Sequence, residues 1–198
     1  MASSQEKTTQ TIRALVGIPD SKPTLTDSVL IIIDAQNEYA TGLLKVARLN
    51  ETRSAIKALL DRYRSSGGSV IHVAHQSPEG APIFTPGTPL ASIFDELTPV
   101  EGEPVVHKAH ATAFTGTDLK KHLDLTKKNK IAVVGYMAHN CVSATIRAAA
   151  ELGYDSYAVK DAIGDRDIPG ATAEELVRVT LAELADVVAT IVDSKDIQ

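Results

Sequence analysis

Short apolar runs rich in Val and Ile recur along the chain, separated by stretches in which apolar residues have helical spacing. The first run, residues 29–33, is apolar at every position, which is typical of a strand buried on both faces of a sheet. The other runs are mostly apolar, with an occasional polar residue. Together they predict strands at residues 29–33, 69–74, 105–106, 130–135, 156–159 and 187–192.

The segments between these runs predict the helices. The longest helix is expected to begin near Asn50 as its N-cap, with Glu51 in the first turn, and to end at Gly67 and Gly68. Residues 75–104 are rich in proline, so we expect a long loop with one short helix at residues 92–97. The remaining helices are predicted at residues 117–123, 140–152 and 171–184, with an amphipathic turn at residues 12–16.

Strands that alternate with helices predict a parallel sheet with helices on both faces, because parallel neighbours need crossover connections. We therefore expect a three-layer α/β/α, doubly wound, mostly parallel fold in one domain, residues 25–198, after an N-terminal extension at residues 1–24. In such sheets ligands bind beyond the carboxyl ends of the strands. Asp34, Lys108 and Cys141 each lie at or just after a predicted strand end, so we expect them to meet.

Composition and charge restrict the class of protein. The 198 residues include one cysteine, which excludes an intramolecular disulfide, and the net charge of -5 argues against a nucleic-acid or anionic-membrane surface. The expected partner is a small molecule or another copy of the chain. The N-terminus is polar and no apolar run is long enough to cross a membrane, so we expect a cytoplasmic protein; export without a signal peptide stays an alternative.

Cys141 is the strongest chemical candidate. It lies at a predicted strand-to-helix turn, where the partial positive charge of a helix N-terminus favours thiolate over thiol. Lys108 as a neighbouring cation is expected to lower the pKa of this thiol, and Asp34 to take its proton and return it to a leaving amine. The alternative for Cys141 is a buried, unreactive side chain.

Three motifs resemble those of the isochorismatase-like cysteine hydrolases, a family that includes isochorismatases and nicotinamidase-related amidohydrolases. They are Asp34-Ala35-Gln36, the segment 104–108 followed by Ala113-Phe114, and the segment 135–142 with Thr145. The resemblance covers residues 28–193 in order. It implies a Rossmann-like fold, hydrolase activity, a catalytic triad of Asp34, Lys108 and Cys141, and a homo-oligomer, either a dimer or a tetramer.

The resemblance also implies how an oxyanion is stabilised and which residues line the substrate pocket. The donors of the oxyanion hole are expected to be the backbone N–H groups of Met137 and Cys141, with a cis peptide bond between Tyr136 and Met137. The matched motifs and their neighbours give the pocket candidates Gln36, Asn37, Tyr39, Phe114, Tyr136, Ala138 and His139.

The nucleophile motif is a hybrid, and it leaves more than one reaction open. Many amide-cleaving members have Thr at the position of Ala138, whereas Met137-Ala138-His139 resembles the isochorismatases, which cleave a vinyl ether but carry Gly at the position of Cys141. We therefore expect hydrolysis of a small amide or related C–N bond through a Cys141 thioester. The alternatives are ether hydrolysis with Asp34 as the acid, and a non-catalytic binding scaffold with a redox-sensitive cysteine.

No metal ion and no cofactor are expected. His72 and His75 are three residues apart on a strand, so their side chains should point to opposite faces rather than to one ion, and His107 and His110 lie further along the chain.

Overall fold

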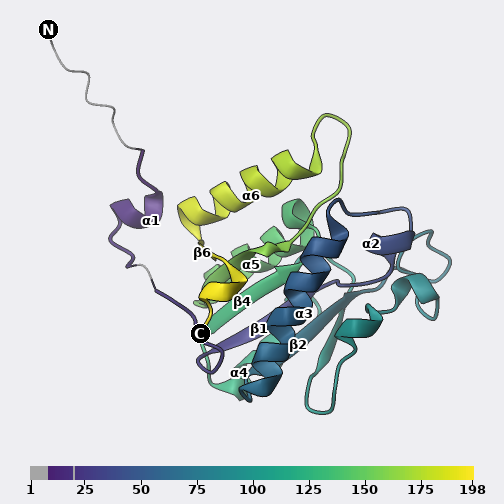
Figure 1. The fold of residues 1–198 in the computed structure, drawn as a ribbon, viewed down its shortest axis with the longest axis horizontal. Coiled ribbons are helices and arrows are strands. Elements are labelled where there is room, and N and C mark those ends of the chain that lie inside the picture. The colour runs from purple at the N-terminus through teal and green to yellow at the C-terminus, as the bar shows by residue number, and fades with distance from the viewer. Residues whose placement is uncertain (1–8, 20) are drawn as a thin grey trace, which may run out of the picture.

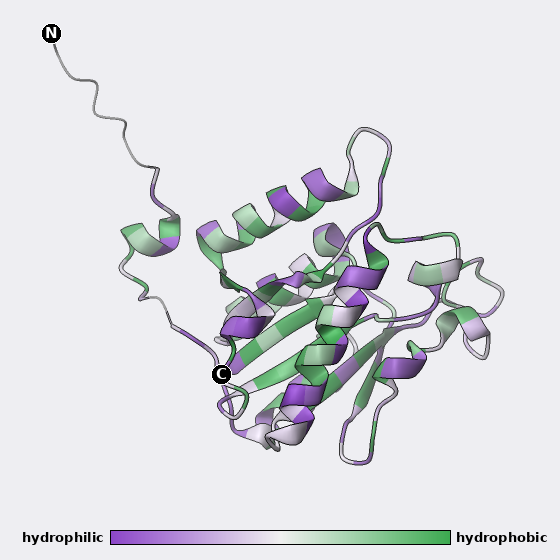
Figure 2. Ribbon diagram, in the orientation of Figure 1, coloured by the Kyte–Doolittle hydropathy of each residue, from purple (hydrophilic) through white to green (hydrophobic). Residues whose placement is uncertain are grey.

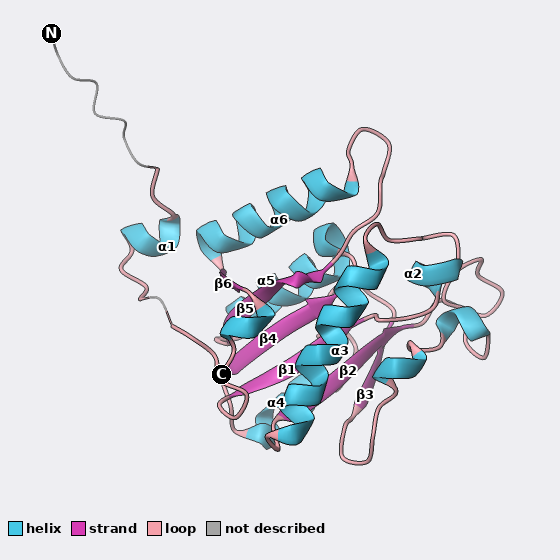
Figure 3. Ribbon diagram, in the orientation of Figure 1, coloured by secondary structure: helices cyan, strands magenta, loops and turns pink. Residues whose placement is uncertain are grey.

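The computed structural model describes residues 9–19 and 21–198, and its centre is a six-stranded sheet in which every pairing is parallel (Figures 1 and 3). The strands are β1 (Ser28–Ile33), β2 (Ser69–His75), β3 (Val105–Lys108), β4 (Lys130–Gly135), β5 (Asp155–Ile163) and β6 (Ala189–Val192). Their order is β3-β2-β1-β4-β5-β6. The chain therefore moves outward from β1 through β2 to β3, and then returns to place β4 beside β1.

Helices cover both faces of the sheet. α3 (Leu49–Ser65) packs on one face, and α4 (Leu119–Thr126), α5 (Ser143–Glu151) and α6 (Ala173–Val187) pack on the other (Figure 1). Two short helices, α1 (Ile12–Leu15) and α2 (Glu38–Thr41), lie outside these layers. This arrangement confirms the predicted α/β/α, doubly wound fold.

The alternation of side chains along β1 explains why both layers are needed. Leu30 and Ile32 join the cluster that contains Leu59 and Leu60 of α3, while Ile31 and its neighbours join the cluster on the opposite face. All six residues of β1 are buried. Because successive side chains of a strand point to opposite faces, an all-apolar strand is stable only between two helical layers. Figure 2 shows the strands as apolar ribbons between more polar helices.

Several boundaries differ from the prediction, each for a local reason. β5 runs to Ile163 because it is bulged: Val133 pairs with Ala158 but Gly135 pairs with Ile163, so five steps on β5 match two on β4. The proline-rich loop holds two 3₁₀ turns, Pro89–Ala91 and Asp95–Leu97, in place of one helix at 92–97. Asn50 is not the N-cap, because α3 begins one residue earlier, at Leu49, with Arg48 as the cap.

The segment before β1 is attached to the outer edge of the fold. The backbone N–H of Ile12 donates to Asp186 of α6, Arg13 donates to Thr190 of β6, and the hydroxyl of Ser21 donates to Asp155 of β5. No helix among residues 9–19 and 21–198 has the length and apolar character of a membrane span.

Gly135, at the end of β4, has no room for a side chain against β1. Its φ is +111°, and a Cβ built there would lie 2.0 Å from the carbonyl oxygen of Ile33. The residues that follow these two positions are Asp34 and Tyr136, so this close approach sets the spacing of the two loops that follow β1 and β4.

Substitution of Gly135 by Ala should therefore destabilise the fold, by about 3 kcal/mol or more, because a backbone clash adds to the strain of positive φ. Gly153→Ala is the matched control, since Gly153 also has positive φ but open space where its Cβ would lie. We expect a loss of about 1 kcal/mol for the control. Urea unfolding measures both free energies, and equal losses would contradict the importance of the contact with Ile33.

Candidate active site

The structure brings Asp34, Lys108 and Cys141 together at the carboxyl edge of the sheet. Asp34 follows β1, Lys108 is the last residue of β3, and Cys141 lies in a π-helical turn (Ala138–Val142) between β4 and α5. Lys108 Nζ is 2.8 Å from Asp34 Oδ2 and 3.1 Å from Cys141 Sγ. The three side chains are almost closed off from solvent, since their residues are 0%, 2% and 4% exposed.

The local backbone conformation directs the Asp34 side chain toward Lys108 and Cys141. Its φ of 49° is left-handed, a conformation that Asp tolerates better than most residues, and it turns the chain away from the sheet directly after β1. The backbone N–H of Asp34 donates to the carbonyl of Val73 on β2, while its own carbonyl accepts from the N–H of Gln36. Neither oxygen of Asp34 has a hydrogen-bond partner among the described residues, and only Oδ2 is in ion-pair contact with Lys108, so Oδ1 is available to accept a proton.

Lys108 is held by more than the two predicted partners. Nζ also lies 3.1 Å from Nδ1 of His75 and 3.1 Å from the carbonyl oxygen of His110. His75 is the last residue of β2 and is paired in register with Lys108. From the sequence His75 is a candidate only as a metal ligand, because nothing there shows that the ends of β2 and β3 are side by side.

Burial dominates the proton equilibria of the triad. Desolvation raises the pKa of the Cys141 thiol to about 12, with the Asp34 carboxylate acting in the same direction and the Lys108 cation opposing. Burial also raises the pKa of Asp34, although Lys108 opposes it. For Lys108 burial acts to lower the pKa, but Asp34 and Cys141 outweigh it and raise the pKa.

Lys108 acts on the thiol pKa in the expected direction, but burial and the Asp34 carboxylate outweigh it. A thiol with a pKa of about 12 keeps its proton at neutral pH. The same geometry offers another means of activation, because oxygen of Asp34 and sulfur of Cys141 lie within 4.8 Å of one another. A proton can pass from sulfur to carboxylate without a change in the net charge of the triad.

The nucleophile turn leaves one of the two expected oxyanion donors, the backbone N–H of Met137, without a partner among the described residues. The peptide bond between Tyr136 and Met137 is cis. The next N–H, of Ala138, donates to Gly164. The carbonyl of Met137 accepts from Asn140 and Val142, which fixes the turn that carries Cys141.

Aromatic residues pack beside the triad. The ring of Tyr39 lies 5.3 Å from Phe84 and 5.4 Å from Tyr136, and Phe84 lies 5.1 Å from the ring of His75. Tyr136 is fully buried, and its hydroxyl is hydrogen-bonded to Thr52 of α3. Its ring therefore links Tyr39 to the helix that covers this face of the sheet. The Tyr39 hydroxyl has no partner among the described residues. Burial raises its pKa well above the usual value, and the nearby Asp34 carboxylate acts in the same direction.

Other pocket candidates hold the backbone in the described structure. Gln36 is fully buried; its amide donates to the carbonyls of His75 and Ala91 and accepts from the N–H of His75. Asn37 donates to the carbonyl of Pro89. These two side chains therefore attach the proline-rich loop to the ends of β1 and β2. Phe114 stacks on Tyr154, and Ala138 is fully buried.

His139 points to a carboxylate that the sequence analysis missed. Its Nδ1 lies 2.8 Å from both oxygens of Asp165, and its backbone N–H donates to the same carboxylate. Asp165 also accepts from the N–H of Arg166 and is 1% exposed. The imidazole borders a hollow of about 550 Å³ between α5 and α6. Asp165 thus attaches the loop after β5 to the loop that carries the nucleophile.

A metal ion at the triad would have to displace Lys108. Ligand atoms of Asp34, His75 and Cys141 lie within 4.8 Å of one another, but Lys108 Nζ is within 3.1 Å of each of these residues. His72 is bonded to Glu103 instead, so His72 and His75 do not converge.

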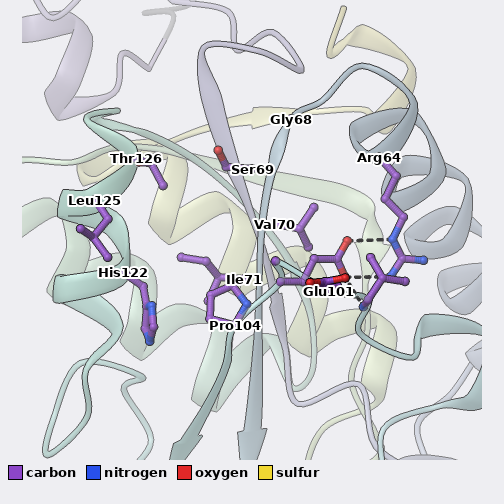
Figure 4. A pocket seen from close by; sticks show the side chains of 13 residues that line it. Arg64, Gly68, Ser69, Val70, Ile71, Glu101, Pro104, His122, Leu125 and Thr126 are labelled. Carbon is purple, nitrogen blue, oxygen red and sulfur yellow. Dashed lines mark hydrogen bonds and ion pairs between the residues drawn. The ribbon is translucent and has the colours of Figure 1, made fainter.

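A hollow of about 600 Å³ lies at the amino ends of β2 and β3, whereas the triad lies at the carboxyl edge of the sheet; Figure 4 shows the residues that line this hollow. It is lined by Ser69, Val70 and Ile71 at the start of β2 and by Pro104 just before β3, beside the ion pair of Arg64 and Glu103. Ligands of doubly wound sheets bind at the carboxyl edge, so the triad remains the candidate site.

Alkylation of Cys141 should show the raised thiol pKa. The rate with iodoacetamide is expected to keep rising toward a pKa of about 12, whereas a free cysteine levels off above roughly 8.5. Lys108→Met removes the cation that lowers the pKa and should slow the reaction further. Lys120→Met, which removes an exposed lysine paired with Asp124, should leave the rate unchanged. Mass spectrometry follows the adduct, and a plateau at or below about pH 8 in the native protein would contradict the assignment.

Asp165→Asn tests the attachment of the nucleophile loop. The amide cannot accept every N–H that the buried carboxylate accepts, so the free energy of unfolding should fall by about 2 to 3 kcal/mol. Asp161→Asn is the matched control, because Asp161, near the end of β5, also accepts a backbone N–H but is exposed. Denaturant titration of both variants should show a loss below about 1 kcal/mol for the control; similar losses would show that Asp165 has no special role.

Comparison with known proteins agrees with this geometry. The isochorismatase domain family matches residues 28–196. The secreted isochorismatase effector Isc1 of Verticillium dahliae is 53% identical, over 93% of this chain and 97% of its own. A streptothricin hydrolase of Streptomyces noursei is 32% identical, over 72% of this chain and 51% of its own. The crystal structure of an isochorismatase from Pseudomonas putida has a TM-score of 0.92 and 34% identity, covering 96% of this chain and 100% of its own. With its sheet, its helical layers and its domain match over residues 28–196, the chain belongs to the isochorismatase family of hydrolases.

Proposed function

We propose that the protein hydrolyses the C–N bond of a small amide through a thioester on Cys141. The observation that carries this proposal is the contact of one buried ammonium with both a carboxylate and a thiol: Lys108 Nζ lies 2.8 Å from Asp34 and 3.1 Å from Cys141. A carboxylate that can hold one proton next to a nucleophilic sulfur supplies both the base and the acid that amide cleavage needs.

The reaction begins with transfer of the Cys141 proton to Asp34. The sulfur attacks the amide carbonyl carbon, and the negative charge that develops on the carbonyl oxygen is met by the backbone N–H groups of Met137 and Cys141. Support for this role is that the Met137 N–H donates to no described residue, so it can donate to substrate. The C–N bond then breaks as Asp34 returns the proton to the nitrogen, and the amine leaves.

Hydrolysis of the thioester follows the same route in reverse. Asp34 takes a proton from a water molecule, the hydroxide attacks the thioester carbon, and the C–S bond breaks. The proton on Asp34 then returns to sulfur, and the product is a carboxylic acid. Throughout, Lys108 keeps its charge and remains within contact of whichever partner, Asp34 or Cys141, is the anion.

Relatives support C–N cleavage. A relative from Pseudomonas putida that is named as a maleamate amidohydrolase is 28% identical over 69% of this chain and 72% of its own. The presence of Cys141 supports the covalent route, since the resembling isochorismatase motif has no thiol at this position.

One observation favours a second candidate, the hydrolysis of a vinyl ether with Asp34 as the acid. Burial raises the pKa of Asp34, and a carboxyl group that holds its proton can protonate such a substrate. Met137-Ala138-His139 also resembles the isochorismatase motif. In this reaction Cys141 would form no bond to substrate, so the two candidates differ in their dependence on the thiol.

A turnover screen of small primary amides, carbamoyl compounds and isochorismate, with the native protein and Cys141→Ala, separates them. We expect amide turnover by the native protein, a loss of at least about 10³-fold in Cys141→Ala, and an acyl adduct on Cys141 in acid-quenched samples by mass spectrometry. Cys141→Ser, which replaces the thiol by a hydroxyl of similar size, serves as the matched variant.

Two outcomes would contradict the proposal. Turnover of isochorismate that survives in Cys141→Ala would favour the ether reaction. Absence of turnover on every class, with no adduct on Cys141, would favour a binding scaffold.

A further inference from the structure

The Lys108 ammonium has more acceptors around it than it has protons. Four groups lie within 3.1 Å of Nζ: Asp34 Oδ2, Cys141 Sγ, His75 Nδ1 and the carbonyl oxygen of His110. An ammonium donates three hydrogen bonds. Its contacts with Cys141, His75 and the carbonyl of His110 have hydrogen-bond geometry, whereas Asp34 Oδ2, at 2.8 Å, is its ion-pair partner and makes no hydrogen bond among the described residues. His75 and His110 therefore take two of the three donors and help to determine where the amine lies.

His75 is half-buried at the end of β2, and its neighbours hold it in place. Its backbone N–H donates to the side-chain oxygen of Gln36, and its carbonyl accepts from the Gln36 amide nitrogen. The imidazole packs edge-on against Phe84, with ring centroids 5.1 Å apart. Backbone and ring are therefore both restrained, and Nδ1 is directed at Lys108.

The contact also defines the protonation state of the ring. Lys108 is a donor only, so Nδ1 of His75 must be an acceptor and carry no proton. The ring is then neutral, with its proton on Nε2.

We propose that His75 is a positioning residue for the reaction proposed above: its unprotonated Nδ1 keeps the Lys108 ammonium in contact with both Asp34 and Cys141. The inference rests on the proposed function for its catalytic consequence, but the contact itself is tested independently. His75 does not need to touch the substrate for this role.

The charges around His75 maintain the neutral ring. Lys108 and His110 face it as potential cations, and Asp34 and Cys141 face it from β1 and from the nucleophile turn. Burial, with Lys108 and then His110 acting in the same direction, lowers the pKa of His75 to about 4. The ring is therefore neutral above that pH. Below it, the protonated ring would place a donor and a second positive charge against Nζ.

Paired substitutions test the positioning role. His75→Leu removes the acceptor, and we expect kcat to fall by about 100-fold with little change in KM, because the reacting groups lose their alignment. His75→Asn offers an amide oxygen near the place of Nδ1 and should stay within about fivefold of the native kcat. His107→Leu, on the exposed side of β3, is the matched control and should leave kcat unchanged. Equal kcat values for His75→Leu and the native protein, or equal losses in the Leu and Asn variants, would overturn the proposal.

Nitrogen NMR of the histidine-labelled native protein tests the contact without any substrate. We expect His75 to show an unprotonated Nδ1 at neutral pH and to titrate near pH 4, and its Nδ1 signal to move in Lys108→Met. A proton on Nδ1, or a signal that ignores Lys108→Met, would overturn the proposal even if His75→Leu fails to fold. If the protein cleaves no amide but these spectra are as expected, the proposed function fails and the His75 contact stands.

Discussion

The buried ion pair between Lys108 and Asp34 is the interaction on which the site depends. Removing two charges from water costs several kcal/mol per ion, and their attraction offsets this only when geometry is close and the remaining donors have partners. Here the atoms are 2.8 Å apart and Nζ has further acceptors in Cys141, His75 and His110. The ion pair is therefore a buried polar group at the carboxyl edge of the sheet, and the thiol of Cys141 is in direct contact with it.

The sheet order explains how residues so far apart in sequence reach this centre. β1 occupies a central place, with β2 and β3 on one side and β4 and β5 on the other. Asp34, at the end of β1, is therefore approached by Lys108 from the β3 side and by Cys141 from the β4 side. Gln36 attaches β1 to β2, and Asp165 attaches the loop after β5 to the nucleophile turn. The polar side chains around the triad thus restrain backbone on both sides of it.

The strand ends could be predicted from the sequence because apolar runs stop abruptly at Asp34 and at the nucleophile turn, and this is sufficient to place the triad in one region. The contacts around the triad could not be predicted. Asp165 accepts from a residue 26 positions earlier in the chain, and His75 meets Lys108 across 33 positions. Such pairings depend on strand register, which periodicity alone does not define.

The net direction of the Cys141 pKa could not be predicted either, for the same reason. The sequence shows a cation and a helix start near the thiol, both of which lower its pKa, but it does not show that Cys141 is 4% exposed. Burial reverses the direction, to a pKa of about 12. The surroundings of Tyr136 could not be predicted either: its motif indicates the pocket, but only the structure shows that it is fully buried and that its hydroxyl is bonded to Thr52.

The charge state of Lys108 is the most direct test of this account. Proton-nitrogen NMR of the lysine side chains at neutral pH should show one ammonium that exchanges slowly with water, because Nζ is enclosed by four acceptors, and this signal should shift in Cys141→Ala. A neutral amine at Lys108, or an ammonium that exchanges as fast as that of the exposed Lys120, would contradict the central claim.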